Sequence, residues 1–177
     1  MVFPNDSQIK GIFGKMFTAK LADFNEEVKP DGDRITQATI ELYQAVCERF
    51  LPTPAKIHYL FNLRDISKVF QGMLRAHKDF HDTRMSLLRL WVHECFRVFS
   101  DRLIESDQEV FVTMIGEKLG AHFDQTFHSV CPEKRSPIFG DFTEEDATVL
   151  YYKDLTDVSK LKEFMELKLE EYNEQLG

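Results

Sequence analysis

The hydrophobic positions of this chain follow helical periodicity over most of its length, because apolar residues recur three and four positions apart. The pattern predicts a helix over residues 7–24, preceded by a polar capping cluster, and a second helix over 34–50 after a turn at 30–33. The two prolines that follow end the second helix, since proline lacks the backbone N–H. The residues expected to face inward are Ile9, Ile12, Phe13, Met16, Phe17, Leu21, Phe24, Ile35, Ala38, Leu42, Val46 and Phe50.

A third helix is predicted to open at Asn62, after a short extended or irregular stretch at 57–61. Asn62 and Asp65 have the spacing of a capping box, in which each side chain accepts a backbone N–H at the helix start. The stripe expected to face inward in this helix is Leu63, Ile66, Val69, Phe70, Met73 and Leu74.

Two longer helices are predicted next, over 82–104 and 108–123. Their expected inward residues are Leu87, Leu88, Trp91, Cys95, Val98, Phe99, Phe111, Met114, Ile115 and Leu119. Three charged residues on another face have the spacing of weak surface ion pairs, namely Glu94, Arg97 and Asp101. His93 and Glu94 are adjacent and should point about 100° apart on a helix, so they are poorly placed to share a metal ion.

The character of the chain changes after residue 128. Residues 128–155 contain two prolines and a glycine, with a β-like run at 148–152, which is typical of a connector rather than of a loop inside a compact domain. A last helix is predicted over 157–173, capped by Thr156 or Asp157. Its expected stripe is Leu161, Phe164, Met165, Leu169 and Tyr172. The residues therefore predict a mainly α fold of five helices, an irregular or short-β connector, and a final helix.

The charge of the chain is negative and unevenly distributed. The formal net charge is −8, and the stretch from Ser129 to Gly177 holds 12 acidic and 6 basic residues. A general nucleic-acid binder or a protein that docks on an anionic membrane needs a basic surface. We therefore expect neither nucleic acid nor membrane among its partners.

The cysteines give no sign of a disulfide framework or of a zinc site. Cys47, Cys95 and Cys131 are odd in number and widely spaced, and two of them lie within apolar helical patterns. This usage indicates buried thiols in a reducing compartment. No apolar run approaches the roughly 20 residues needed to span a bilayer.

Three motifs, in order along the chain, resemble dynein heavy chains. Residues 58–72 read HYLFNLRDISKVFQG, similar to a signature of the third AAA+ module, and the FNLRD core resembles the axonemal form. Residues 87–103 read LLRLWVHECFRVFSDRL and resemble a helix of the same lid. Residues 138–142, IFGDF, are similar to the lead-in to the fourth module. Shorter similarities occur at 3–4, 12–14 and 170–173. Ordered motifs over most of the chain are more specific than any one alone.

This resemblance implies a fold and a division of the chain. Residues 1–128 would be the helical AAA+ lid of the third module, with 1–26 leading in from the large subdomain. Residues 129–177 would be the connector and the first helix of the fourth module. The chain would then be an internal piece of a longer polypeptide.

The resemblance also implies that this segment alone does not hydrolyse ATP. An AAA+ ATPase needs a phosphate-binding loop and a carboxylate for Mg²⁺, which the family places upstream. The GIFGKM sequence at 11–16 is too short for such a loop, and Met16 cannot bind Mg²⁺. No cofactor is expected in the isolated segment, whereas ATP or ADP with Mg²⁺ is expected in the full-length module.

The site residue that the resemblance implies is Arg64, which matches the sensor II arginine that reaches nucleotide phosphates from the lid. A guanidinium is permanently charged and forms forked hydrogen bonds with phosphate oxygens. Asn62, Asp65 and His58 would support the helix start. The alternatives are a surface Arg64 paired with Asp65 or another acid, and a packed or capping His58 rather than one that touches adenine or ribose.

The expected partners follow from the same resemblance. They are the large subdomain of the same module and the fourth module, and, through the whole heavy chain, microtubules and dynein intermediate and light chains. The whole protein would be a minus-end-directed microtubule motor ATPase of the cytoplasm and cytoskeleton, in the axoneme of cilia and flagella.

Two other interpretations remain open from the residues alone. One is a free-standing helical adaptor for protein interactions, which explains the periodicity but not the ordered motifs. The other is an HD-type metal phosphohydrolase, since such all-helical proteins bind divalent metals through His and Asp. Its candidate ligands would be His81, Asp82, His58 or His77, and Asp101 or Asp124. Asp82 also has a simpler role as the N-cap of the fourth helix.

Overall fold

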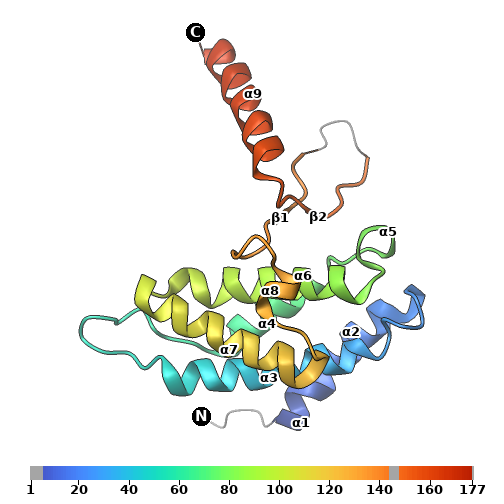
Figure 1. Ribbon diagram of the computed structural model, residues 1–177, viewed down its shortest axis with the longest axis vertical. Helices are drawn as coiled ribbons and strands as arrows, with labels where there is room; N and C mark the ends of the chain where they lie inside the picture. The colour runs from blue at the N-terminus through green and yellow to red at the C-terminus, as the bar shows by residue number, and fades with distance from the viewer. Residues whose placement is uncertain (1–5, 144–147, 177) are drawn as a thin grey trace.

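The computed structural model describes residues 6–143 and 148–176, and these form a mainly helical body with one very small sheet and a projecting last helix (Figure 1). The elements in chain order are α1 Asp6–Ile9, a π-helical turn Lys10–Gly14, α2 Lys15–Lys20, a 3-10 turn Leu21–Asp23, α3 Asp31–Arg49, α4 Leu63–Met73, α5 Lys78–His81, α6 Arg84–Val98, a 3-10 turn Ser100–Arg102, α7 Glu105–Phe123, α8 Phe127–Val130, β1 Phe139–Gly140, β2 Lys153–Asp154 and α9 Val158–Leu176.

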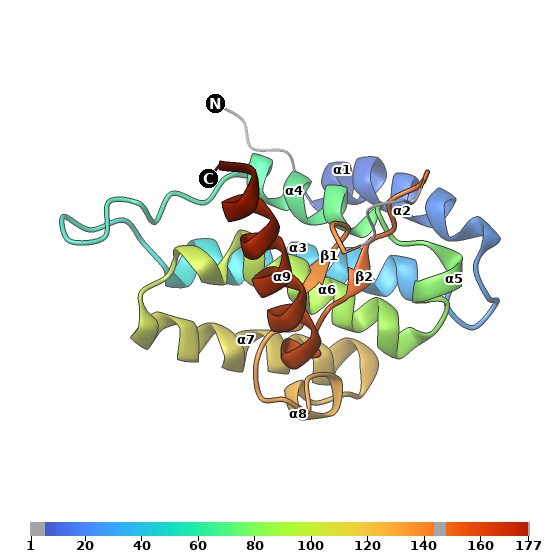
Figure 2. The ribbon, with the colours of Figure 1, turned by 90° about the horizontal axis from the view of Figure 1, so that it is seen from above.

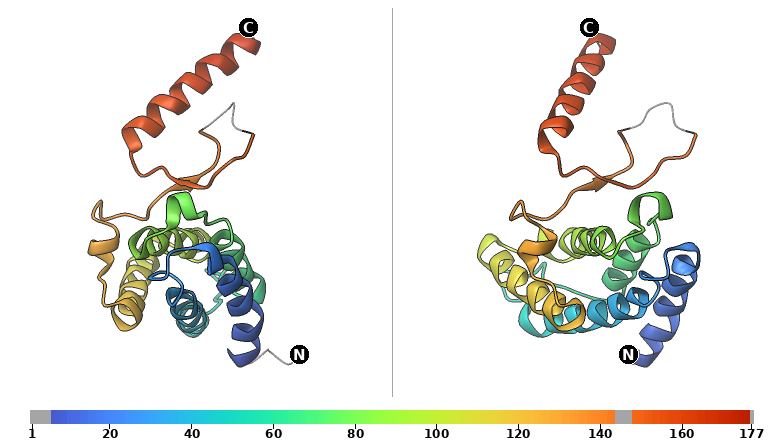
Figure 3. Two further views of the ribbon diagram at one scale, coloured as in Figure 1. Left: turned by 90° about the vertical axis from the view of Figure 1, so that its right-hand side faces the viewer. Right: turned by 45° about the vertical axis from the view of Figure 1, so that its right-hand side comes forward.

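The helical body is held by two principal packings, α3 along α7 and α4 along α6. Figure 3 shows these helices close to end-on, gathered around a common interior. Trp91 of α6 lies in that interior, fully buried as predicted, and its indole N–H donates a hydrogen bond to the Thr39 hydroxyl of α3 at 2.9 Å. The segment between α3 and α4 extends from one side of this body (Figure 2).

The first helical segment differs from its prediction in the face it buries. Phe17 and Leu21 are fully buried, whereas Ile12 and Met16 are 57% and 49% exposed although both were predicted to face inward. The segment packs against α3 and also against α4, where Phe13 stacks on Phe70 with ring centroids 4.9 Å apart. One edge of the predicted apolar face of this segment is therefore exposed to solvent.

Helix α3 begins at Asp31, inside the turn predicted at 30–33. Asp31 is fully buried, and its carboxylate accepts a hydrogen bond from Arg84 Nε at 2.8 Å and lies 3.5 Å from Arg34. An acidic residue in the first turn is also favoured by the helix dipole. The ion pair with a residue 53 positions away explains why local sequence alone placed the helix start too late.

The predicted fourth and fifth helices are divided differently in the structure. Thr83, not Asp82, is the N-cap of α6, because the Asp82 carboxylate accepts the backbone N–H of Asn25 at 2.6 Å instead. Helix α6 ends at Val98, six residues before its predicted end, and α7 starts three residues before its predicted start. The residues predicted to face inward on α6 are buried.

The connector contains the strands, at positions other than the predicted β-like run at 148–152. β1 and β2 pair antiparallel, with Phe139 opposite Asp154 and Gly140 opposite Lys153. Strand pairing depends on a partner segment as well as on propensity, so the run of β-branched and aromatic residues alone gave the wrong position. Residues 144–147 of this connector lie outside the described residues.

Helix α9 is capped as predicted but packs little. The Asp157 carboxylate accepts the backbone N–H of Lys160 at 3.3 Å. The predicted inward stripe is largely exposed: Met165, Leu169 and Tyr172 are 53%, 58% and 59% exposed. Figure 1 shows why, since α9 points away from the helical body. Among the described helices, none is long and apolar enough to cross a membrane.

Candidate functional site

The start of α4 is fixed by the predicted capping box. The Asn62 side chain accepts the backbone N–H of Arg64 at 2.9 Å, and the Asp65 carboxylate accepts the backbone N–H of Asn62 at 2.9 Å. Asp65 is buried and also forms an ion pair with Arg102 at 2.9 Å. The Arg102 guanidinium in turn lies 4.6 Å from the Phe61 ring centroid. These contacts hold the first turn of the helix in one orientation.

Arg64 stands on this fixed turn with its side chain exposed. The predicted alternative, in which Arg64 pairs with Asp65, is not observed. Asp65 instead binds Arg102 and the Asn62 backbone N–H. Within the described ranges 6–143 and 148–176, the structure records no hydrogen bond or ion pair to the Arg64 guanidinium. The side chain is thus placed where an anion on a neighbouring surface can reach it.

Tyr59 anchors the segment that leads into α4. Its hydroxyl donates to the Asp107 carboxylate at 2.7 Å and accepts the Ile104 backbone N–H at 2.9 Å. Lys56 completes the cluster at 2.6 Å from Asp107, and its hydrogen bond, followed by that of Tyr59, lowers the pKa of Asp107. His58 is exposed and meets the Tyr59 ring edge-on at 4.8 Å, so it is neither buried in the core nor a cap.

A groove of about 340 Å³ opens beside the same helix start. Its walls are Asp6, Ile9, Tyr43, Gln44, Cys47, Glu48, Phe61 and Leu63. Cys47 is half-buried there, and burial raises the pKa of its thiol, which disfavours the reactive thiolate. The groove offers shape and apolar surface next to the Arg64 turn, but no nucleophile.

Glu94 is buried, contrary to its prediction. It was predicted to form weak surface ion pairs, yet its side chain is only 1% exposed. Its carboxylate accepts Arg97 Nε at 2.9 Å and the Tyr152 hydroxyl at 2.8 Å. The Tyr152 hydroxyl is also 2.8 Å from His93 Nε2, so the adjacent His93 and Glu94 side chains, expected to diverge, meet at one oxygen of the connector.

A sequence signal for this burial exists. Glu94 lies three residues after Trp91 and four before Val98, which are both buried on the inward stripe of α6. A carboxylate on such a stripe must find partners, because burying an unpaired charge is very costly. The partner on the connector, Tyr152, is 58 residues away and could not be identified from spacing.

Arg89 makes the second polar contact between α6 and the connector. Its Nε donates to Asp154 at 2.7 Å, one terminal nitrogen donates to the Val130 carbonyl at 2.8 Å, and the other donates to the Thr156 hydroxyl at 3.0 Å. Burial of Asp154 acts to raise the pKa of its carboxyl, but the hydrogen bonds from Arg89 and Thr156 outweigh it, and the pKa is lowered. One guanidinium therefore joins α6 to the end of α8, to the last residue of β2 and to the segment that follows β2.

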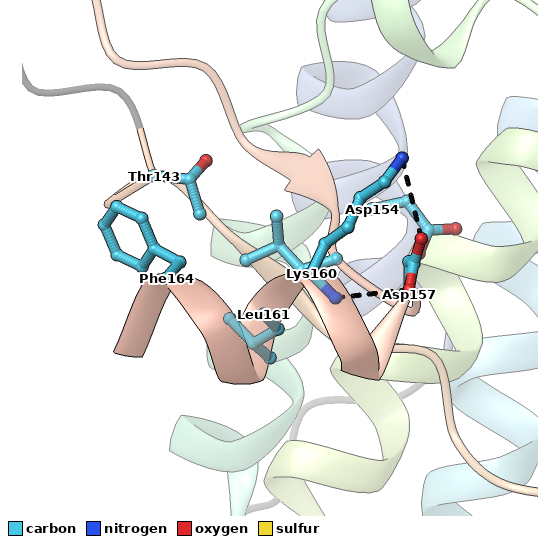
Figure 4. Close-up of a pocket in the computed structure, with 7 residues that line it drawn as sticks. Thr143, Asp154, Asp157, Lys160, Leu161 and Phe164 are labelled. Atoms are coloured by element: carbon cyan, nitrogen blue, oxygen red, sulfur yellow. Dashed lines mark hydrogen bonds and ion pairs between the residues drawn. The ribbon is translucent and has the colours of Figure 1, made fainter. Parts of the chain in front are cut away.

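A pocket of about 320 Å³ lies at the base of α9 (Figure 4). It is lined by Thr143, Asp154, Leu155, Asp157, Lys160, Leu161 and Phe164. Both carboxylates already have structural partners, since Asp154 binds Arg89 and Asp157 caps α9. The pocket therefore contains no free acid–base pair, and Arg64 does not line it.

The residues proposed for an HD-type metal site are not assembled. His81 is buried, its Nδ1 accepts the backbone N–H of His77 at 3.0 Å, and burial lowers the pKa of its imidazole. Asp82 is engaged by Asn25. In the part of the chain that the structure describes, no three His, Cys, Asp or Glu side chains are grouped so that they could hold a metal ion. The geometry contradicts this interpretation.

The helical body matches a known class of domain. A family model described as the AAA+ lid domain matches residues 35–131, which run from the first turns of α3 to just past the end of α8. The chain belongs to the AAA+ lid domain family.

Curated relatives narrow this class further. Dynein axonemal heavy chain 2 from Mus musculus and from Homo sapiens are each 62% identical over 174 residues, which is 98% of this chain. The Dynein-1-beta heavy chain, flagellar inner arm I1 complex, from Chlamydomonas reinhardtii is 43% identical over 172 residues. The sequence is thus that of an axonemal dynein heavy chain in its lid region. The chain spans about 4% of the length of these relatives.

Proposed function

We propose that this segment is the lid of the third AAA+ module of an axonemal dynein heavy chain and that Arg64 senses the nucleotide bound there. The observation that carries the proposal is an exposed guanidinium on a capped helix turn whose neighbouring acid is already paired with Arg102. A phosphate contact made in one nucleotide state and lost in another shifts the equilibrium between lid positions. The connector and α9 would pass that movement to the fourth module.

The proposed division of the chain places the lid in residues 1–128, led in by 1–26, and the connector with the first helix of the fourth module in 129–177. ATP or ADP with Mg²⁺ would be held by the large subdomain, with Arg64 as the lid's contribution and Asn62, Asp65 and His58 supporting it. The lid by itself supplies no hydrolytic group, so catalysis belongs to the full-length protein. That protein would be a minus-end-directed microtubule motor.

Its location and partners belong to the same proposal. The names of the relatives point to the axoneme of a cilium or flagellum. The direct partners of this segment would be the large subdomain and the fourth module, both in the same polypeptide. Microtubules and the intermediate and light chains would meet the heavy chain elsewhere.

The test replaces Arg64 by alanine in the heavy chain. Because a charge-assisted hydrogen bond to phosphate contributes about 1.5–3 kcal/mol, we expect the affinity of the third module for MgATP to fall roughly 10- to 100-fold. Lys68→Ala is the matched control, since Lys68 is another exposed cation on α4. Affinity would be measured with a fluorescent ATP analogue. Equal affinities for the two variants would exclude the sensor role.

A further inference from the structure

The C-terminal end of α4 lies where this helix meets both α6 and the connector. Gly72 lies near the end of α4, and a Cβ added there would be 1.9 Å from Glu94 Cδ and 2.1 Å from its Oε2. The Glu94 carboxylate therefore lies directly against the α4 backbone. Only glycine leaves room for it, because no side chain can occupy the space of a carboxylate.

The same carboxylate holds the connector. Its Oε1 accepts the Tyr152 hydroxyl at 2.8 Å, and Tyr152 is buried just before β2. Arg75, three residues beyond Gly72, stacks its guanidinium 4.1 Å from the Tyr152 ring centroid and forms an ion pair with Asp141. We call Gly72, Arg75, Glu94 and Tyr152 the α4–connector joint. It places one buried charge between a helix and a segment that is otherwise irregular.

Arg64 and Gly72, the residue through which α4 meets the joint, belong to one helix. Helix α4 is 11 residues long and buries Ile66, Val69 and Phe70 in the core. Eight residues separate Arg64 from Gly72, which corresponds to roughly 12 Å along the axis. A packed helix of this length moves as a unit, because close-packed interiors transmit displacement rather than absorb it.

We infer that the α4–connector joint couples the Arg64 end of α4 to the connector, so that a tilt of α4 moves β2 and the base of α9. This inference rests on the proposed function for its trigger and names the residues that carry the movement onward. Glu94 is a positioning residue in it and touches no nucleotide. Glu94 and Tyr152, the hydrogen-bonded pair at its centre, are buried, so they hold one arrangement firmly when their hydrogen bonds are made.

The first arm of the test needs no nucleotide. Tyr152→Phe removes one oxygen and leaves the ring, and Tyr151→Phe is the matched control, since the described residues give the Tyr151 hydroxyl no hydrogen-bond partner. In the heavy chain, we expect the backbone amides of 148–157 to exchange hydrogen about tenfold faster in Tyr152→Phe, as a lost bond to a charged group implies. Unchanged exchange relative to Tyr151→Phe would overturn the inference.

A glycine substitution tests the other side of the joint. Gly72→Ala should raise the exchange rate of the same connector amides. Gly116→Ala on α7 should not, because the nearest atom to a Cβ added there is 3.9 Å away. Since Gly72→Ala can also impair folding, the decision rests on Tyr152→Phe, which introduces no clash. An equal rise in the exchange rate of these amides in both glycine variants would contradict a specific role of the joint.

The second arm uses MgATP as the probe and separates the inference from the proposed function. In Tyr152→Phe we expect MgATP affinity within about twofold of wild type, but loss of the change that MgATP causes in the exchange of 148–157. If MgATP still causes the full change in the exchange of 148–157, the inferred coupling through the joint is excluded, whereas the sensor role of Arg64 is not. Normal MgATP affinity in Arg64→Ala would instead exclude the sensor role, whatever the joint does.

Discussion

At the scale of single residues, the effect of a charged side chain in this lid depends on which element carries its partner. Glu41 on α3 illustrates this, because its carboxylate meets His122 at 2.9 Å and Lys118 at 3.2 Å, both on α7. The His122 hydrogen bond is the main reason that the pKa of Glu41 falls from 4.5 to about 2. These contacts join α3 to α7, whose packing forms one half of the helical body.

This shift predicts a pH dependence of stability. A carboxyl with a depressed folded pKa contributes stability above its unfolded pKa and loses it as pH falls. We expect Glu41→Gln to destabilise the chain at pH 6 and the difference from wild type to shrink between pH 4.5 and about 2. Urea unfolding over that range measures it. Glu117→Gln, an exposed change on α7, is the control, and a similar trend in that variant would contradict the assignment.

At the scale of elements, helix α4 shows how local signals and distant contacts combine. The capping box at Asn62 and Asp65 was predicted from spacing and is confirmed, because both of its hydrogen bonds lie within four residues. The ion pair of Asp65 with Arg102 is not local and was not predicted. The element was therefore predictable, whereas the pairing that takes Asp65 away from Arg64 was not.

The cap itself has a measurable energy. Asn62→Ala should lower the free energy of unfolding by about 1 kcal/mol, because the first-turn N–H groups lose their acceptor. Asn62→Asp keeps an acceptor and should remain within a few tenths of a kcal/mol of wild type. Chemical denaturation of both variants gives the comparison. If alanine and aspartate behave alike, the hydrogen bond at this cap does not stabilise the helix.

At the scale of the whole molecule, α9 stands apart from the helical body (Figure 1). Its large apolar residues Met165, Leu167 and Leu169 are all more than half exposed. Surface ion pairs such as Lys162 with Glu166 contribute little to a helix. An unsupported helix of this length is only marginally stable in water.

Hydrogen exchange of the 177-residue chain should reveal this difference. The amides of α9 are expected to exchange at least 100-fold faster than those of α6, whose apolar residues are buried, because local opening costs little where few contacts are lost. Mass spectrometry of peptides from 158–176 and 84–98 measures both. Comparable protection of the two helices would mean that α9 is held by contacts other than those of this structure.

The sequence by itself determined the mainly helical fold, the α4 cap, the buried faces of α3 and α6, and the change of character after residue 128. These features depend on residues a few positions apart, which interact in any context that lets a helix form. The tertiary structure alone decided the start of α3, the pairing of β1 with β2, and the burial of Glu94. Each of these depends on a partner outside the same element, such as Arg84 for Asp31 and Tyr152 for Glu94, and periodicity carries no information about such partners.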